Sequence, residues 1–310
     1  MKMFSNWRQK LALALSGLVV ASGVVIAAPA QAATSHDGSA VCETPTPLPI
    51  GAVPAPFLKL PFRARDGVAS LKVTNGWVVA ADEETYTGPG LHKALDFEFT
   101  RQANHGYGLP VVAAAAGRAY VSYQNITDNW VDPQGVTHRI GVGAGLFVEV
   151  RHCNGFVTQY IHLGTVAAGI PYLPPVPDPD VPGDWIPSGI FQSNEVLWAF
   201  GVPVKQGQVL GTQGDTGIGL DWNDDFNVQT GTVAPRDREQ KPPWDLTQLH
   251  FQPYQSRVNG SKQNILDPSD LRAQITATSN PYTPCPGVFG LGPNHLWLTG
   301  PFGQPLYAAL

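Results

Sequence analysis

Hydrophobic and polar residues alternate along several short stretches of the chain, which is the pattern of β-strands that bury one face. Glycine, proline and asparagine separate these stretches and favour turns between them. The pattern predicts a mainly β fold with few helices. The stretches are GWVVAA (76–81), ALDFEF (94–99), LPVVAAAAGRAYVSYQN (109–125, interrupted by Gly117), GLFVEVRHCNGFVTQYIHL (145–163), VPVKQGQVLGTQGDTG (202–217) and QLHFQPY (248–254).

The stretch 145–163 is predicted to form a hairpin, because Asn154-Gly155 favours the positive φ angles of a two-residue turn. Three longer segments show no periodicity and are expected to be loop insertions, either functional lids or decoration. They are residues 126–140, 164–200 and 218–246.

The N-terminus has the three parts of a secretory signal peptide, which we place at residues 1–32. A basic start with Lys2, Arg8 and Lys10 precedes a long apolar run, and Ala30-Gln31-Ala32 forms a small-residue cleavage site. A permanent membrane anchor is the alternative, since the apolar run approaches the length that spans a bilayer. We favour export of a protein without a stable membrane anchor. Residues 33–60 are then a Pro-rich lead-in, 61–275 the main domain and 276–310 a Gly/Pro-rich tail.

Charge argues against a nucleic-acid-binding protein. Removal of the signal peptide leaves 16 basic against 24 acidic residues, a net charge of −8. An acidic, exported chain without basic runs is a poor partner for nucleic acids.

Three cysteines allow at most one disulfide within the chain. Cys42 and Cys285 have similar Pro-rich surroundings, CETPTP and TPCPG, whereas Cys153 lies at the predicted hairpin turn. We therefore expect a Cys42–Cys285 bridge.

The histidine in QLHFQPY poses the main functional question. On a strand, His250 shares a face with Gln248 and Gln252, and it is either a hydrogen-bonded histidine or a metal ligand. In LHKALDF, His92 and Asp96 stand four positions apart, about 13 Å on a straight strand. Both can reach one metal only if the chain turns just after His92.

Four segments follow one another along the chain in this order: LHKALDF, then YIHL with His162, then GQVLGTQGDTG, then QLHF. Over roughly residues 60–272, this set resembles the lysostaphin/LytM family of zinc endopeptidases that cut bacterial peptidoglycan peptides. The family pattern is H-x-x-x-D, Y-x-H-L, a glycine-rich segment ending in T-G, and H-L-H-F. No single block is specific, but the ordered set is. The resemblance implies an antiparallel β-sheet core.

The resemblance also implies a zinc site with one ion per chain. His92, Asp96 and His250 match the family's ligands, and two imidazoles with one carboxylate leave a fourth position open for catalysis. His162 matches a residue that stands beside the activated water, where it orients the water or moves protons. On this basis His250 is favoured as a ligand.

Two positions depart from the family pattern. Gln248 replaces the first histidine of H-L-H-F, and an amide cannot accept a proton at neutral pH. Ala94 stands where the family has glycine, so alanine is strained there if the position needs positive φ. The leading hypothesis is a secreted zinc endopeptidase acting on peptidoglycan peptides in the extracellular or cell-wall space of a bacterium. The rival is a weak or inactive member that binds wall peptides or regulates another hydrolase.

Overall fold

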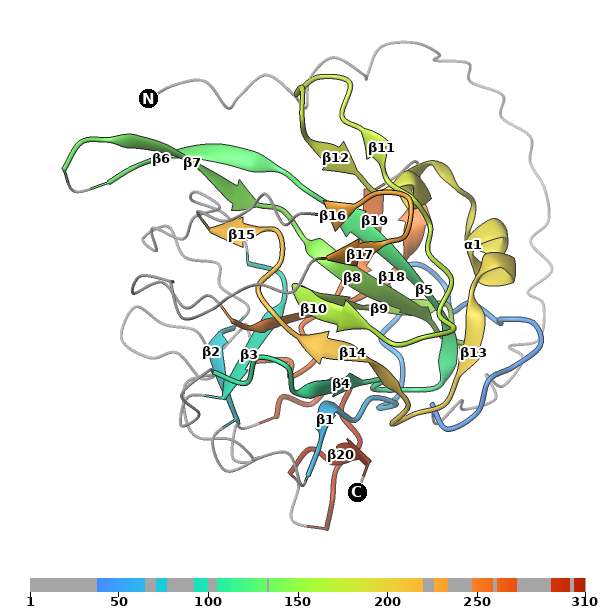
Figure 1. Ribbon diagram of the computed structural model, residues 1–310. Helices are drawn as coiled ribbons and strands as arrows, with labels where there is room; N and C mark the ends of the chain where they lie inside the picture. The colour runs from blue at the N-terminus through green and yellow to red at the C-terminus, as the bar shows by residue number, and fades with distance from the viewer. Residues whose placement is uncertain are drawn as a thin grey trace, which may run out of the picture. The chain divides into compact units, whose positions relative to one another are not determined.

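The structure is a computed structural model of the 310-residue chain (Figure 1). It describes residues 38–64, 71–76, 92–99, 105–132, 134–219, 226–233, 247–258, 261–271, 291–301 and 304–309. The predicted signal peptide (1–32) and Cys285 lie outside the described residues, as does most of the stretch 76–81.

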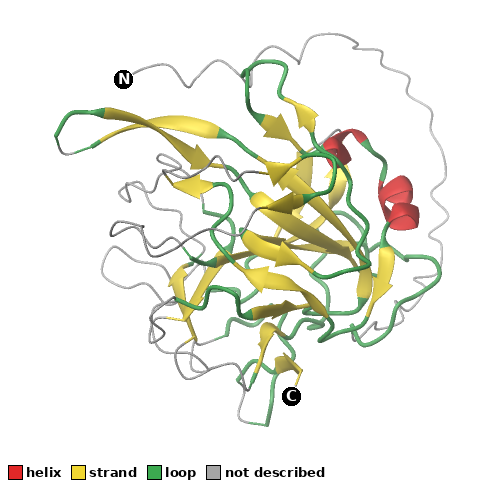
Figure 2. Cartoon of the chain, viewed as in Figure 1, coloured by secondary structure: helices red, strands yellow, loops and turns green. Residues whose placement is uncertain are grey.

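An eight-stranded antiparallel sheet forms the centre of the fold (Figures 1 and 2). Its strand order is β13-β5-β8-β9-β18-β3-β2, and β19 pairs with the second half of β18. The mainly β fold with an antiparallel core is therefore confirmed. The strands are β2 (Leu71–Asn75), β3 (Leu95–Phe99), β5 (Gly117–Gln124), β8 (Gly145–Arg151), β9 (Phe156–Ile161), β13 (Val202–Val204), β18 (Leu249–Val258) and β19 (Ser261–Ile265).

Smaller sheets surround this one, in the orders β10-β14-β4, β15-β7-β6, β1-β20, β11-β12 and β16-β17. The strands of the two three-stranded sheets are β4 (Pro110–Val112), β6 (Thr127–Val131), β7 (Thr137–Val142), β10 (Leu163–Val166), β14 (Val209–Gln213) and β15 (Ile218–Gly219). The two-stranded sheets contain β1 (Leu60–Arg63), β11 (Val176–Pro177), β12 (Trp185–Ile186), β16 (Phe226–Asn227), β17 (Thr232–Val233) and β20 (Tyr307–Ala309).

Helix is scarce in the described part of the chain, as the sequence predicts. It consists of the 3₁₀ helix η2 (Ser188–Phe191) and the short α1 (Asn194–Phe200). Ser193 caps α1, because its hydroxyl accepts a hydrogen bond from the Val196 N–H.

Alternation along the central strands separates a core face from a polar face. On β18, Leu249 and Phe251 are fully buried in the hydrophobic core, with the rings of Tyr160 and Trp297 against Phe251. Because neighbouring strand residues point to opposite faces, His250 belongs to the other face of the sheet. The candidate site therefore lies on a face that the core packing does not fill.

Two expectations about loops are wrong. Residues 126–140 form most of the β6–β7 hairpin, and 164–200 contain β10, the β11–β12 hairpin, η2 and α1. The turn between β8 and β9 spans four residues, and only Gly155 in it has a positive φ, of 83°.

The expected Cys42–Cys285 bridge is also wrong, because Cys42 is bonded to Cys153. The lead-in runs along the turn of the β8–β9 hairpin, where the Thr46 N–H donates to the Cys153 carbonyl at 2.7 Å. This hydrogen bond holds the lead-in beside the turn. The Cα atoms of Cys42 and Cys153 lie 5.8 Å apart there, within the range of a disulfide.

Candidate metal centre

His92 lies just before β3, and a bend at Ala94 separates it from the strand. The bend brings His92 Nε2 to 3.1 Å from Asp96 Oδ2, as the metal hypothesis requires. Ala94 does not have a positive φ, so the alanine at this position causes no strain of that kind. His92 Nδ1 donates to the Gly76 carbonyl at 2.7 Å, which leaves the lone pair on Nε2 facing the carboxylate.

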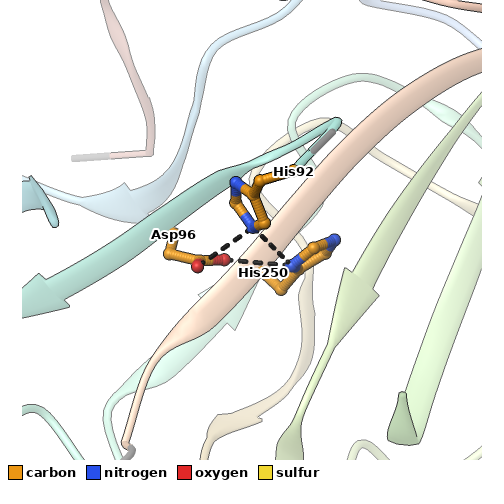
Figure 3. A group of neighbouring side chains, drawn as sticks. All are labelled: His92, Asp96 and His250. Carbon is orange, nitrogen blue, oxygen red and sulfur yellow. Dashed lines mark hydrogen bonds and ion pairs between the residues drawn. The ribbon is translucent and has the colours of Figure 1, made fainter. Parts of the chain in front are cut away.

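His250 reaches the same point from the neighbouring strand. In the antiparallel pairing of β18 with β3, His250 is the direct partner of Asp96, so the two side chains share a face. His250 Nδ1 lies 3.0 Å from Asp96 Oδ1 and 3.2 Å from His92 Nε2. Figure 3 shows the three side chains converging on one point.

The spacing of these atoms suits a zinc ion. Two ligands about 2.0–2.1 Å from a tetrahedral zinc are about 3.3 Å apart. The three separations here are 3.0, 3.1 and 3.2 Å. The cluster is also open on one side, because the His250 side chain is 19% exposed while that of Asp96 is 3% exposed.

The polar atoms of the cluster are incompletely satisfied without a cation. Asp96 Oδ1 is buried and forms no hydrogen bond with the described residues, despite its closeness to His250. A buried carboxylate oxygen in that state costs free energy, and a metal ion would remove the cost. The donor set and its unmet oxygen therefore fit zinc.

Electrostatics favour the protonation states that a metal needs. Burial alone would raise the pKa of Asp96, but His92 and His250 more than offset this, so the pKa lies below its usual range. Burial lowers the pKa of His250 more than the adjacent Asp96 raises it. At pH 7, Asp96 is therefore a carboxylate and His250 is a neutral imidazole, as metal coordination requires.

His162 is placed beside this cluster by unusual backbone. It follows β9 with a left-handed φ of 63°, which is uncommon for a residue other than glycine and clusters at functional sites. Its Nδ1 donates to the Thr216 carbonyl at 3.0 Å, and its ring lies 5.8 Å from that of His250. Tyr160, two residues earlier on β9, is buried in the hydrophobic core against Phe251.

Burial lowers the pKa of His162 to about 4, and His250 contributes to the lowering. The imidazole is therefore neutral at pH 7. Because Nδ1 carries the proton donated to Thr216, Nε2 is the atom that can accept a further proton. The sequence motifs include the segment GQVLGTQGDTG, but none of them indicates that its Thr216 carbonyl orients His162.

Gln248 lies two residues before His250 and is half-buried. Its backbone pairs with Gly214, and its N–H donates to the Gly214 carbonyl at 3.2 Å. The start of β18 is thus joined to the glycine-rich segment whose Thr216 carbonyl accepts the hydrogen bond from His162. The role of the Gln248 amide stays a prediction.

No protein-family model and no curated protein matches the chain. Solved structures do match it, and the resemblance indicated by the sequence motifs is found again among them. One is the antimicrobial peptidase lysostaphin from Staphylococcus simulans, with a TM-score of 0.33, 16% identity, and coverage of 78% of this chain and 63% of that chain.

Two other solved structures have similar scores. Csd3 from Helicobacter pylori matches with a TM-score of 0.29 and 17% identity, over 66% of this chain and 31% of that chain. A zinc-containing peptidase from Vibrio cholerae matches with a TM-score of 0.28 and 15% identity, over 66% of this chain and 38% of that chain. The chain spans less than two thirds of each of these three chains.

Proposed function

We propose that the chain is a zinc metalloendopeptidase that hydrolyses peptide bonds of bacterial peptidoglycan. The observation that supports this most is the convergence of His92 Nε2, the Asp96 carboxylate and His250 Nδ1 within 3.0–3.2 Å of one another. Two imidazoles and one carboxylate hold one zinc ion and leave a coordination position open, which is the composition of a catalytic centre. When bound, zinc supplies polarisation of a peptide carbonyl and activation of water.

In this proposal, His162 transfers the proton from the attacking water to the leaving amine. Its ring is fixed by the bond to the Thr216 carbonyl, and its neutral Nε2 accepts a proton from water as the water attacks. The same atom then returns the proton to the leaving amine. The left-handed backbone at His162 is what directs the ring toward His250 instead of into the core.

Gln248 has a narrower role than the histidine it replaces. Its amide N–H can donate to a substrate carbonyl, but its oxygen cannot hold a proton at neutral pH. Catalysis then depends on His162 alone, and turnover is expected to be slow.

The substrate and location are inferred from the sequence. The ordered motifs indicate peptidoglycan peptides as the substrate, and the signal-peptide pattern of residues 1–32 indicates secretion. In the part of the chain that the structure describes, no helix is long and apolar enough to cross a membrane.

Gln248 also favours a second candidate function, in which the chain binds wall peptides or regulates another hydrolase without cutting. Such a protein binds the peptides and has lost one proton-transfer group. The metal ligands argue for the first candidate, because binding alone does not require them.

Cleavage of soluble peptidoglycan peptides by the purified protein separates the two. We expect new amine termini with added zinc, loss of cleavage with a chelator, and recovery when zinc is restored. Binding of the peptides without cleavage, at any zinc concentration, would support the second candidate.

A further inference from the structure

A second polar group lies beside the metal cluster, on the same face of the central sheet. Gln252 is two residues beyond His250 on β18 and therefore points to the same side. Its direct partner on β9 is Gln159, and both side chains are buried, at 7% and 3% exposure. Lys262, on β19, extends its ammonium group to both amides.

Among the described residues, the contacts of Lys262 leave one donor unused. Its Nζ donates to Gln159 Oε1 and to Gln252 Oε1, and it lies 5.3 Å from the centre of the Tyr254 ring. An ammonium has three N–H groups, so these two acceptors satisfy only part of it. Lys262 is also partly exposed, whereas the two amides below it are buried.

The charge of Lys262 is not balanced inside the described part of the protein. Both acceptors are neutral, and Lys262 forms no ion pair with any described residue. The nearby Glu149 is already shared by Arg257, at 2.7 Å, and Arg151, at 3.6 Å. Burial lowers the pKa of Lys262 to about 7, Arg257 lowers it further, and Glu149 offsets only part of this lowering. A bound anion would offset the cost of burying the charge.

Gln252 connects this group to the metal cluster. While its Oε1 accepts from Lys262, its Nε2 donates to the Lys93 carbonyl at 2.8 Å, and Lys93 adjoins His92. Two residues of strand separate His250 from Gln252, about 7 Å. An extended peptide advances about 3.3–3.6 Å per residue, so two residues of substrate cover the same distance.

We propose that Lys262, supported by Gln159 and Gln252, forms a subsite for a substrate carboxylate that lies within two residues of the cleaved bond. This inference rests on the proposed peptidase function and names its substrate class: peptides with a free carboxylate near the scissile bond. The third N–H of Lys262 donates to the carboxylate, in a charge-assisted hydrogen bond.

The test compares two forms of one probe. Soluble peptides released from bacterial cell wall are used as they are, or after conversion of their free carboxylates to primary carboxamides. Both forms are given to the zinc-loaded protein, with binding read by surface plasmon resonance and cleavage by new amine termini. The variants are Lys262→Met, Lys262→Arg, which keeps the charge, and Lys205→Met, in which an exposed lysine is replaced.

We expect the wild-type protein to bind the carboxylate peptides at least about tenfold more tightly than the amidated ones, as for a hydrogen bond to a charged group. Lys262→Met should lose this preference and keep its zinc content. Lys262→Arg should retain part of the preference, and Lys205→Met all of it.

Equal binding of the two peptide forms by the wild-type protein would overturn the subsite, and so would an unchanged preference in a folded Lys262→Met. A carboxylate preference that depends on Lys262 but comes without cleavage would keep the subsite and refute the peptidase proposal. Cleavage of both peptide forms at equal rates, together with equal binding, would refute the subsite and keep the peptidase proposal.

Discussion

His250 and Asp96 are direct partners in the antiparallel pairing of β18 with β3, and His250 Nδ1 lies 3.0 Å from Asp96 Oδ1. A contact between residues 154 positions apart thus follows from strand register. A one-residue slip of β18 would turn His250 to the core face and replace it with Leu249 or Phe251. The register is fixed by those two buried side chains, so core packing and the candidate centre depend on each other.

Replacement of Gln248 by histidine should increase cleavage, because it restores a group that can accept a proton beside His250. His162→Ala should reduce cleavage by about 10²–10⁴-fold, and Gln248→Ala by less, since His162 moves the proton in the wild-type protein. Initial rates on soluble peptidoglycan peptides and zinc content are the measurements. Gln192→His, at an exposed glutamine, is the control. Loss of zinc or slower cleavage in Gln248→His would refute the proposed role of this position.

The Cys42–Cys153 bridge should contribute to stability. It joins residues 111 positions apart, and closing a loop of that length contributes about 4–5 kcal/mol in the chain-entropy model. Cys42→Ser should lower the free energy of unfolding by up to that amount, measured by urea denaturation. Peptide mapping without reducing agent should recover Cys42 linked to Cys153. A Cys42–Cys285 peptide would contradict the pairing.

Glu149 should make stability depend on pH in acid. It is fully buried and accepts hydrogen bonds from Tyr254 and Arg257. Burial by itself would raise its pKa, but Arg257 and Arg151 lower the pKa to about 2, from 4.5. Because the folded pKa is depressed, the stabilisation is complete above pH 4.5 and is lost as pH falls toward 2.

The stabilisation is about 3 kcal/mol for a shift of this size. Denaturant unfolding at several pH values between 2 and 6 measures it. Glu149→Gln should be less stable at pH 6 and should lose most of the slope between pH 2 and 4.5, whereas Glu43→Gln, at an exposed position, should keep the slope. An unchanged slope in a folded Glu149→Gln would show that other groups cause the acid sensitivity.

Local patterns in the sequence predicted the strands that carry the candidate site. The alternation in ALDFEF and QLHFQPY follows from one buried face, and β3 and β18 occupy those stretches. The β6–β7 hairpin escaped prediction because residues of its outer half, such as Asp128, Asn129, Thr137 and Arg139, are exposed, so no apolar alternation marks these strands.

Contacts between distant segments could not be predicted in the same way. The Cys42–Cys153 pairing depends on how the lead-in runs past a hairpin turn, and similar flanking prolines carry no information about that path. Lys262 meets Gln159 and Gln252 only because β19, β18 and β9 are adjacent in the sheet, and no local motif records this. His92, Asp96 and His250 were proposed together because their order along the chain follows a family pattern.

The central claim is that His92, Asp96 and His250 hold one zinc ion. Elemental analysis of the purified protein after dialysis tests it most directly, together with Asp96→Ala and, as a control, Asp180→Ala at an exposed aspartate. We predict about one zinc per chain in the wild-type protein and in Asp180→Ala, and far less than one in a folded Asp96→Ala. Full zinc occupancy in Asp96→Ala, or no zinc in the wild-type protein after incubation with the ion, would contradict the claim.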